Sequence, residues 1–553
     1  MQRFKLGRRI SLRLGINDKI CFSHKLSSPL NGPQLQEKIN DLHDYYVPMD
    51  LNSDYKQRKV TAIKKLNYIL NNSNRHSLQD SEYEELLLCS LTLVYYFGMK
   101  LKISMLTSKY WHWCGKRLFL KAESAFQRTM DLLQPELNEP AMKITLAFFS
   151  EVDLWPFENF VSQILEVVLY FSGGKTMIFN LMLTDIHCVL FRDVKSARHR
   201  MRVLYELLKS DNWIIDKQKL LPFVTRLLDF FAQSITKDDR VTAYGYLRKG
   251  FEVCLRRIFV RVENKHRVMI ITTMLNWFSL VDMNDDDILE FSNLLDHAAD
   301  LCKVGNYSDS FQPGLIEHIL HNLVGSVKDS YSLVGSRLLQ RLFDRQHNAL
   351  YLVVPTLYYD FQQVQLKIGK YDSGDKLFLL QHRDDLHENI LKAIKNHCCN
   401  SVNLKSVFSL ICCITLEVPC DLSAAMIACM AMAIQDFALN GENLTANSRY
   451  WMHAIVISVM SLICWVHKAP VLYRYVNQII ERRAKEAPQL NPPLMHAYKL
   501  GHHHVTWNKP TLFFEDWELR YALWKHFQDI RPSMLKQNRE KIGKKVPAMD
   551  LMN

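Results

Sequence analysis

A short glycine-rich segment is the first place in this sequence where the residue types could bind a nucleotide. Gly173, Gly174, Lys175 and Thr176 resemble the end of a phosphate-binding loop, in which backbone amides and a lysine surround the phosphates. The full pattern requires a glycine five residues before Gly174, where this sequence has Leu169 within an apolar helical pattern. We therefore predict a turn between two helices here and no nucleotide site.

A run of acidic and amide side chains begins like a calcium-binding loop. Asp282, Asn284 and Asp286 occupy the first, third and fifth positions of such a loop. Asp287 stands where the loop requires glycine, and Asn293 stands where it requires a bidentate glutamate. We therefore predict an acidic helix start rather than a calcium site.

Cysteines and histidines could hold a transition metal. The pairs Cys398-Cys399 and Cys412-Cys413 lack the spacing of zinc ligands, and cysteines on amphipathic helices are usually small core residues. Residues 502–504 are three adjacent histidines, which cannot all point one way on regular backbone. The sequence also lacks the Gly-x-Ser-x-Gly motif of acyl transfer. We therefore predict no metal, no cofactor, no small-molecule substrate and no enzymatic activity.

The elements that would have to position any functional site are predicted to be helices. Apolar residues recur at helical spacing from about residue 56 onward, for example at Leu220, Val224, Leu227 and Phe231. Glycine and proline number only 18 and 17 in 553 residues, so the residues that interrupt helices are scarce. A chain of this length is too long for one compact core. We therefore predict an all-α fold, an ARM/HEAT-like helical-repeat solenoid that forms a rod.

We expect four parts along the chain. These are a basic, largely unstructured N-terminal arm at 1–55, the N-terminal part of the solenoid at 56–305, a C-terminal helical block at 306–490 and a helical, basic tail at 491–553. The stretch 451–466 is nearly all apolar but is shorter than the roughly 18 to 20 residues of a membrane-spanning helix, so we predict a buried solenoid helix. The 13 cysteines follow no secretory pattern, which favours free thiols in a reducing intracellular compartment.

The N-terminal arm concentrates positive charge. The net charge of the chain is +12, and residues 1–30 carry seven basic side chains and one acidic side chain. Apolar residues alternate with the first five cations, so the arm can insert between lipid headgroups while each cation contributes about 1 kcal/mol of attraction to anionic lipid. We therefore predict contact between an anionic phospholipid membrane and Arg3, Lys5, Arg8, Arg9 and Arg13.

Two alternatives remain open. An arm that is rich in arginine, bears serine and is poor in acids is also typical of a mitochondrial presequence, which would make the protein mitochondrial. RNA binding requires cations along one face with aromatic residues beside them. That pattern is only faintly suggested near Trp277 by Arg256, Arg257, Arg261, Lys265 and Arg267. A solvated helix face explains this run better, so we do not expect nucleic acid as a partner.

Between about residue 306 and residue 488, five ordered segments resemble one known family. The first four are 344–348, which reads Asp-Arg-Gln-His-Asn, then 366–368, 414–417 and 435–444. The most specific is the pattern Ile-Glu-x-Arg-x-x-Glu-Ala-Pro at 480–488. These segments are similar to the Rolling blackout family, also called Eighty-five Requiring three. We expect structural roles for the family-matched residues, namely Asp344, Arg345, Asn348, Gln435, Asp436, Glu481, Arg483, Glu486 and Pro488.

The resemblance implies a helical rod at the cytosolic face of the plasma membrane. Proteins of this family anchor a type III alpha phosphatidylinositol 4-kinase complex through the adaptor proteins that carry the kinase, and they perform no catalysis themselves. The resemblance therefore implies two partners, an anionic membrane and lipid-kinase adaptor proteins.

The two ends of this chain differ from the family pattern. Family members typically begin with a cluster of acylated cysteines, whereas the first part of this sequence offers only Cys21 as a possible lipidation site. Because one acyl chain gives marginal attachment, we expect the basic arm to supply most of the membrane affinity. The family also carries a long C-terminal tail for adaptor binding, and this sequence stops at Asn553, so we expect a divergent, shorter member.

Overall fold

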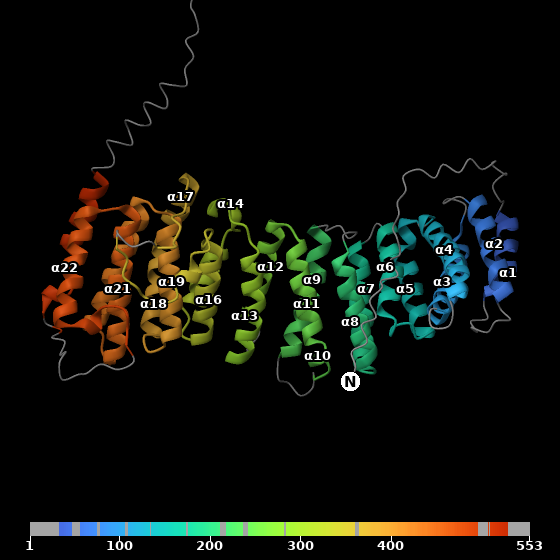
Figure 1. The fold of residues 1–553 in the computed structure, drawn as a ribbon, viewed down its shortest axis with the longest axis horizontal. Coiled ribbons are helices and arrows are strands. Elements are labelled where there is room, and N and C mark those ends of the chain that lie inside the picture. Colours follow the sequence, from blue (N-terminus) through green and yellow to red (C-terminus); the bar gives the residue numbers. More distant parts are fainter. Residues whose placement is uncertain are drawn as a thin grey trace, which may run out of the picture. The chain divides into compact units, whose positions relative to one another are not determined.

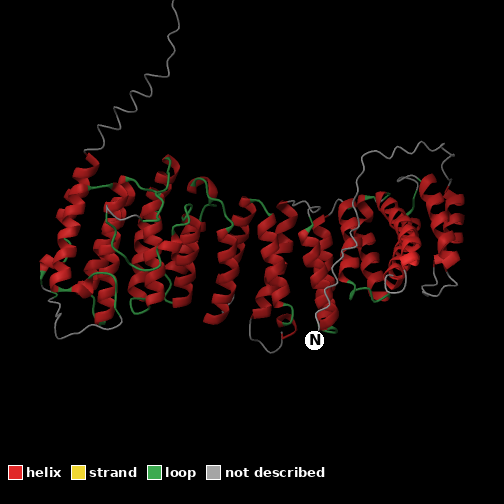
Figure 2. Cartoon of the chain, viewed as in Figure 1, coloured by secondary structure: helices red, strands yellow, loops and turns green. Residues whose placement is uncertain are grey.

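The computed structural model of this protein describes residues 32–46, 56–73, 78–104, 109–132, 134–172, 175–210, 217–235, 242–280, 284–359, 364–495, 507 and 509–528. Within these ranges the regular secondary structure is helical and includes no strand (Figure 2). The predicted all-α fold is therefore confirmed.

The chain divides into two compact units, residues 1–258 and 259–553. Within unit 1 most helices pack mainly against helices one or two places along the chain, as α3 does with α4 and α5. This pattern is typical of stacked helix pairs. The helices of unit 1 are α1 (Gly32–Tyr46), α2 (Lys56–Asn72), α3 (Asp80–Ser104), α4 (Lys109–Asp131), η2 (Pro135–Leu137), α5 (Asn138–Glu151), α6 (Glu158–Phe171), α7 (Lys175–Leu190), α8 (Val194–Lys209), α9 (Lys217–Ile235), α10 (Thr242–Gly245) and most of α11 (Arg248–Arg261) (Figure 1).

Unit 2 begins earlier than the boundary at 305/306 that the sequence suggested, because α13 packs against α16 within the same compact unit. Its last helix, 516–528, follows η7. The other helices of unit 2 are α12 (Asn264–Leu280), α13 (Asp285–Asp300), α14 (Tyr307–Ser310), α15 (Leu315–His318), η4 (Ile319–Val324), α16 (Asp329–Phe343), η5 (Ala349–Tyr351), α17 (Ser373–Gln381), α18 (Arg383–Asn396), α19 (Ser401–Glu417), α20 (Asp421–Asn440), α21 (Ala446–His467), α22 (Pro470–Glu486), η6 (Pro488–Leu490) and η7 (Pro510–Leu512).

Helix α1 corrects the prediction of a largely unstructured arm at 1–55. Leu35, Ile39 and Leu42 lie one helical turn apart on a single face, and all three are buried. This face packs against α2 and α3, so α1 belongs to the core of unit 1. Residues 1–31, with the predicted membrane-contact residues and Cys21, lie outside the described part of the chain.

Two expected helix boundaries agree with the structure. Leu169 is buried inside α6, which ends at Phe171, and α7 begins at Lys175, so the segment that resembles a phosphate-binding loop connects two helices. Helix α13 begins at Asp285, and the side chain of Asn284 accepts a hydrogen bond from the backbone N–H of Asp287 at 3.0 Å. An asparagine cap followed by acidic residues is typical of a helix start.

The apolar stretch 451–466 lies within α21, whose 22 residues exceed the expected length. Among the described residues, α20 and α21 are both long and apolar enough to cross a membrane by length and composition alone. In unit 2, however, 61% of the apolar window of α20 and 83% of that of α21 are buried. Helix α21 packs against α19, α20 and α22. Burial, rather than the length argument, therefore supports the interpretation of α21 as a core helix.

Candidate functional site

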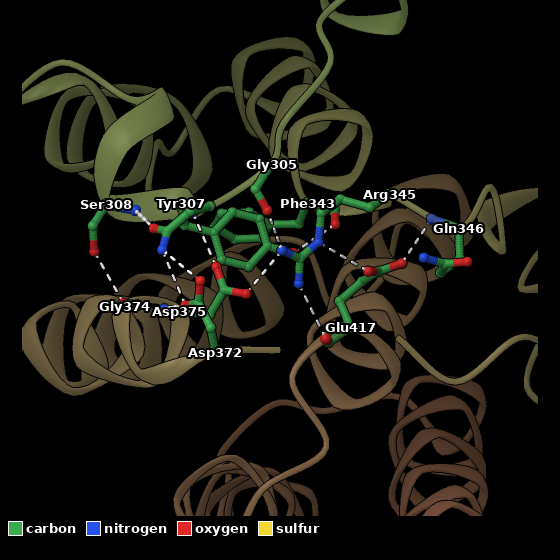
Figure 3. Close-up of polar contacts among 11 residues, drawn as sticks. Gly305, Tyr307, Ser308, Phe343, Arg345, Gln346, Asp372, Gly374, Asp375 and Glu417 are labelled. Atoms are coloured by element: carbon green, nitrogen blue, oxygen red, sulfur yellow. Dashed lines mark hydrogen bonds and ion pairs between the residues drawn. The ribbon is translucent and has the colours of Figure 1, made fainter. Parts of the chain in front are cut away.

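Arg345 lies at the centre of a polar cluster that joins four segments of unit 2 (Figure 3). Its guanidinium pairs with Asp375 in α17 at 2.8 Å and with Glu417 at the end of α19 at 3.3 Å. It also donates to the backbone carbonyl oxygen of Gly305 at 2.8 Å and lies 4.3 Å from the ring centroid of Tyr307. The cluster thereby connects α14, the end of α16, α17 and α19.

Both carboxylates of this cluster are almost inaccessible to solvent. The side chain of Asp375 is 2% exposed and that of Glu417 is 1% exposed. Burial raises the pKa of Glu417 to about 7, although the backbone N–H of Gln346 and the Arg345 guanidinium both act to lower it. Loss of one member of a buried ion pair typically costs about 3 to 5 kcal/mol, because the other charge stays buried and unpaired. Arg345 is therefore a structural connector of unit 2.

Asp344 and Asn348 fix the turn that follows α16. The carboxylate of Asp344 accepts hydrogen bonds from the backbone N–H groups of Asn348 at 2.8 Å and Ala349 at 2.6 Å. The side chain of Asn348 pairs with the backbone of Lys367 in both directions, each at 2.8 Å. These bonds join the family-matched segments 344–348 and 366–368.

Gln435 and Arg483 hold a segment that returns over α20 and α22, residues 509–515, which we call the return segment. The Gln435 amide donates to the carbonyl oxygen of Phe514 and accepts from its N–H, both at 2.9 Å. Arg483 Nε donates to the carbonyl oxygen of Leu512 at 2.7 Å. Glu486 forms an ion pair with Lys509 at the start of the segment.

The guanidinium of Arg483 is completely buried. Its hydrogen bonds to described residues go to the backbone carbonyl oxygens of Leu512, Leu490 at 3.2 Å and His453 at 3.4 Å. Burial lowers the pKa of Arg483 to about 9, which remains well above neutral pH. The carbonyl dipoles therefore stabilise a buried positive charge.

The remaining family-matched residues lie apart from the Arg345 cluster, the turn after α16 and the return segment. Asp436 and Glu481 are exposed, and Glu481 lines a shallow surface hollow together with Lys468 and Arg474. Pro488 is the first residue of η6. The family-matched side chains thus converge mainly on backbone groups and buried ion pairs rather than on a cavity.

The cysteine pairs that were considered as metal ligands lie in α19 and in the turn before it. Cys412 and Cys413 are buried in α19, as predicted, whereas Cys399 is exposed in the turn before α19, contrary to its expected core position. Within the described ranges no group of three or more histidine, cysteine, aspartate or glutamate side chains could hold a metal ion. The three histidines at 502–504 lie outside the described residues.

Two cations of the basic run considered for RNA binding, Arg256 and Arg267, bind other groups of the protein. Arg256 pairs with Glu252 on α11 at 2.7 Å. Arg267 donates to the carbonyl oxygens of Phe259 at 2.7 Å and Leu301 at 2.9 Å, where it satisfies the ends of helices. Arg256 therefore stabilises its own helix, and Arg267 binds α12 to the ends of α11 and α13.

Sequence reasoning missed Tyr307 and Asp375, which complete the Arg345 cluster. The signal available for Asp375 was its position three residues after Asp372, because the Asp372 carboxylate caps α17 by accepting from the Asp375 N–H at 2.8 Å. Tyr307 donates to the carbonyl oxygen of Phe343 at 2.8 Å, and nothing in its local sequence indicates this contact.

Stacked helices joined by side-chain contacts to irregular connections define this chain as an armadillo-repeat protein, and residues 102–515 match the family described as "EFR3, armadillo repeat". The chain belongs to the EFR3 family, which confirms the Rolling blackout resemblance and extends it toward the N-terminus.

Individual relatives are distant. The chain is 25% identical to "Protein EFR3 homolog B" of Homo sapiens over 134 residues, 24% of this chain and 16% of the relative. It is 26% identical to "Protein EFR3 homolog" of Caenorhabditis elegans over 188 residues, 34% of this chain and 21% of the relative. It is 24% identical to "Protein EFR3 homolog A" of Mus musculus over 170 residues, 30% of this chain and 21% of the relative. The matches thus span about a fifth or less of the relatives' length, and no solved structure matches the chain.

Proposed function

We propose that this protein is a non-catalytic scaffold that binds peripherally to the cytosolic face of the plasma membrane and recruits a phosphatidylinositol 4-kinase complex there. The observation that carries the proposal is the family match over residues 102–515. The partners are an anionic phospholipid membrane and the adaptor proteins that carry the lipid kinase. In this role the protein positions the kinase complex at the membrane and catalyses no reaction itself. It uses no cofactor or small-molecule substrate.

The charge distribution supports membrane binding. Five cations alternate with apolar residues in the first 14 positions, and each cation near an anionic surface contributes about 1 kcal/mol. Cys21 provides one site for acylation, which would add to this attraction. The arm and Cys21 together meet the requirement for two weak signals in stable peripheral attachment.

The packing of unit 2 supports a scaffold. Arg345, Gln435 and Arg483 bind irregular connecting segments to the helices through buried contacts. Such contacts restrict the relative movement of neighbouring helices and keep a partner-binding surface preformed. A preformed surface loses less conformational entropy when an adaptor protein binds.

Vesicle flotation with the full chain tests membrane binding. We expect binding to vesicles containing phosphatidylserine, with at least about tenfold weaker binding when Arg3, Lys5, Arg8, Arg9 and Arg13 are all changed to Glu. Added salt should weaken native binding, because exposed charges are screened beyond roughly 10 Å at 0.1 M. A control variant reverses five exposed cations on described helices, namely Lys143, Lys249, Lys265, Arg383 and Lys392. Equal binding by the native chain and the arm variant would remove the arm from the proposal.

Affinity purification from a membrane fraction tests the partner. The lipid kinase and its adaptors should copurify with the full chain and disappear when the arm variant no longer reaches the membrane. A membrane-bound chain that recovers no lipid kinase would contradict the anchoring role. Import into mitochondria predicts loss of residues up to about Ser28 from the mature chain, so an intact N-terminus in the purified protein would exclude it.

A further inference from the structure

The helix at 516–528, drawn in red at the end of the coloured ribbon in Figure 1, has apolar residues on two opposite faces. Its inner face carries Leu519, Ala522 and Leu523, which are 1%, 2% and 7% exposed. Near its end, the ring of Phe527 lies 5.2 Å from that of His467 in α21. The inner face therefore already fixes this helix to the core of unit 2.

The outer face carries Trp517, Tyr521 and Trp524, which we call the aromatic stripe. These side chains are 64%, 47% and 58% exposed, and successive ring centroids lie 6.2 and 6.1 Å apart. Spacings of four and three residues place all three on one side of a helix, and at about 100° per residue that side is opposite Leu519 and Leu523. Three adjacent aromatic side chains thus point away from the core.

The start of the helix at 516–528 is bound to the rest of unit 2. The return segment that precedes it is bound by Gln435 and Arg483, and the N–H of Glu515 donates to the Tyr475 hydroxyl at 2.8 Å. The stripe is therefore presented in a fixed orientation by unit 2. The family match ends at residue 515, so the stripe lies outside the matched segment.

We propose that the aromatic stripe is a second membrane-contact site, which inserts its rings into the headgroup region of an anionic phospholipid bilayer. Tryptophan and tyrosine combine an apolar ring with a polar group and are enriched at membrane interfaces. Arg520 and Lys525 lie on the same helix, where Arg520 pairs with Asp516 at 2.7 Å, and residues 531–553, which follow in the sequence, carry six basic and two acidic side chains. Exposed aromatic rings that are followed in the sequence by a net positive segment match a surface that is apolar below and anionic above.

This inference rests on the proposed membrane scaffold and adds a second contact at the other end of the chain. Two weak contacts on one molecule act together, because the first raises the effective concentration of the second. Changing either the arm or the stripe alone should therefore weaken vesicle binding.

Vesicle flotation of four full-length proteins tests the site. They are the native chain, the arm variant described above, a stripe variant (W517S, Y521S and W524S) and a control with three other exposed apolar residues of unit 2 replaced (V327S, L350S and V353S). We expect the stripe variant to bind phosphatidylserine vesicles on the order of tenfold more weakly than the native chain, and the control to bind equally well. Because the three rings are exposed, circular dichroism should show unchanged helix content.

A second measurement reports insertion directly. Lipids brominated near the headgroup quench tryptophan fluorescence at short range, and a W517F and W524F variant keeps the apolar rings while removing these two fluorophores. Quenching should be strong in the native chain and reduced in this variant, with vesicle binding maintained.

The outcomes separate this inference from the scaffold proposal. A native chain that binds no vesicles overturns both. Binding that depends on the arm, with no effect of the stripe variant and equal quenching in the phenylalanine variant, overturns the stripe alone. A change of oligomeric state or loss of a bound protein in the stripe variant, without any change in vesicle binding, also overturns it and assigns the rings to a protein interface.

Discussion

The side-chain amide of Gln435 pairs with the backbone of Phe514 through two hydrogen bonds of 2.9 Å, although the two residues are 79 positions apart. Both residues are buried. Phe514 lies between η7 and the helix at 516–528, and this pairing satisfies its backbone N–H and C=O groups.

Replacing Gln435 by Leu should destabilise the return segment. The N–H and C=O of Phe514 would both lose a partner in a buried place, at about 1 to 3 kcal/mol each. We expect lower stability in urea unfolding and faster proteolysis after residue 507. Gln36→Ala removes only an exposed side-chain bond to Asn40 at 3.1 Å and should leave both measurements unchanged. Equal proteolysis of the Leu variant and the native chain would contradict the structural role of this pairing.

Replacing Arg345 by Met should cost about 3 to 5 kcal/mol, because Asp375 and Glu417 would be left buried without their cation. Arg345→Lys should recover only part of this loss, since a lysine cannot contact both carboxylates and the Gly305 carbonyl oxygen with one planar group. Denaturant unfolding of the two variants measures the difference. If lysine restored full stability, the planar geometry of the guanidinium would be unimportant.

Glu417 should make unit 2 less stable as pH rises through about 7. Its pKa is raised to about 7 in the folded state from an ordinary value of 4.5, so between these values the folded state binds more protons than the unfolded state. Stability from this group is therefore full below pH 4.5 and is lost as the pH approaches and passes 7. Unfolding measured between pH 5 and pH 8 should show a smaller decrease in Glu417→Gln. An unchanged slope in this variant would show that Glu417 ionises normally.

Gly335 in α16 should not tolerate alanine. A Cβ atom there would lie 2.6 Å from the Cβ of Leu323 and 2.7 Å from the backbone nitrogen of Val324, so α16 and η4 would have to separate. Overpacking of this kind typically costs about 1 to 3 kcal/mol. Gly305→Ala is a matched control, because its Cβ would meet nothing within 4 Å. Thermal unfolding should separate the two variants, and equal melting temperatures would contradict the close approach.

The sequence was sufficient to predict the helical fold, because apolar periodicity and the scarcity of glycine and proline act locally. It was insufficient for α1, whose buried face of Leu35, Ile39 and Leu42 is short and follows a basic segment. The family resemblance identified Arg345 and Arg483 but gave no partners for them. Their contacts reach 72 and 29 positions along the chain, to Glu417 and Leu512, and periodicity carries no information over such separations.

The burial of Arg483 and the exposure of Trp517 and Trp524 also differ from what their residue types and spacing predict. An arginine is almost never fully buried without a paired anion, so the position of Arg483 follows only from the carbonyl groups that surround it. Trp517 and Trp524 have the spacing of a core-facing helix, yet they are exposed because the opposite face of the same helix is the buried one.

Within the described residues, the hydrogen-bond acceptors of Arg483 are backbone carbonyl oxygens, and this has an evolutionary consequence. A carbonyl oxygen is present whatever side chain follows it, so mutations at Leu512, Leu490 or His453 leave the hydrogen-bond acceptors in place. A single residue, Arg483, can therefore maintain this junction while the side chains around it change in evolution.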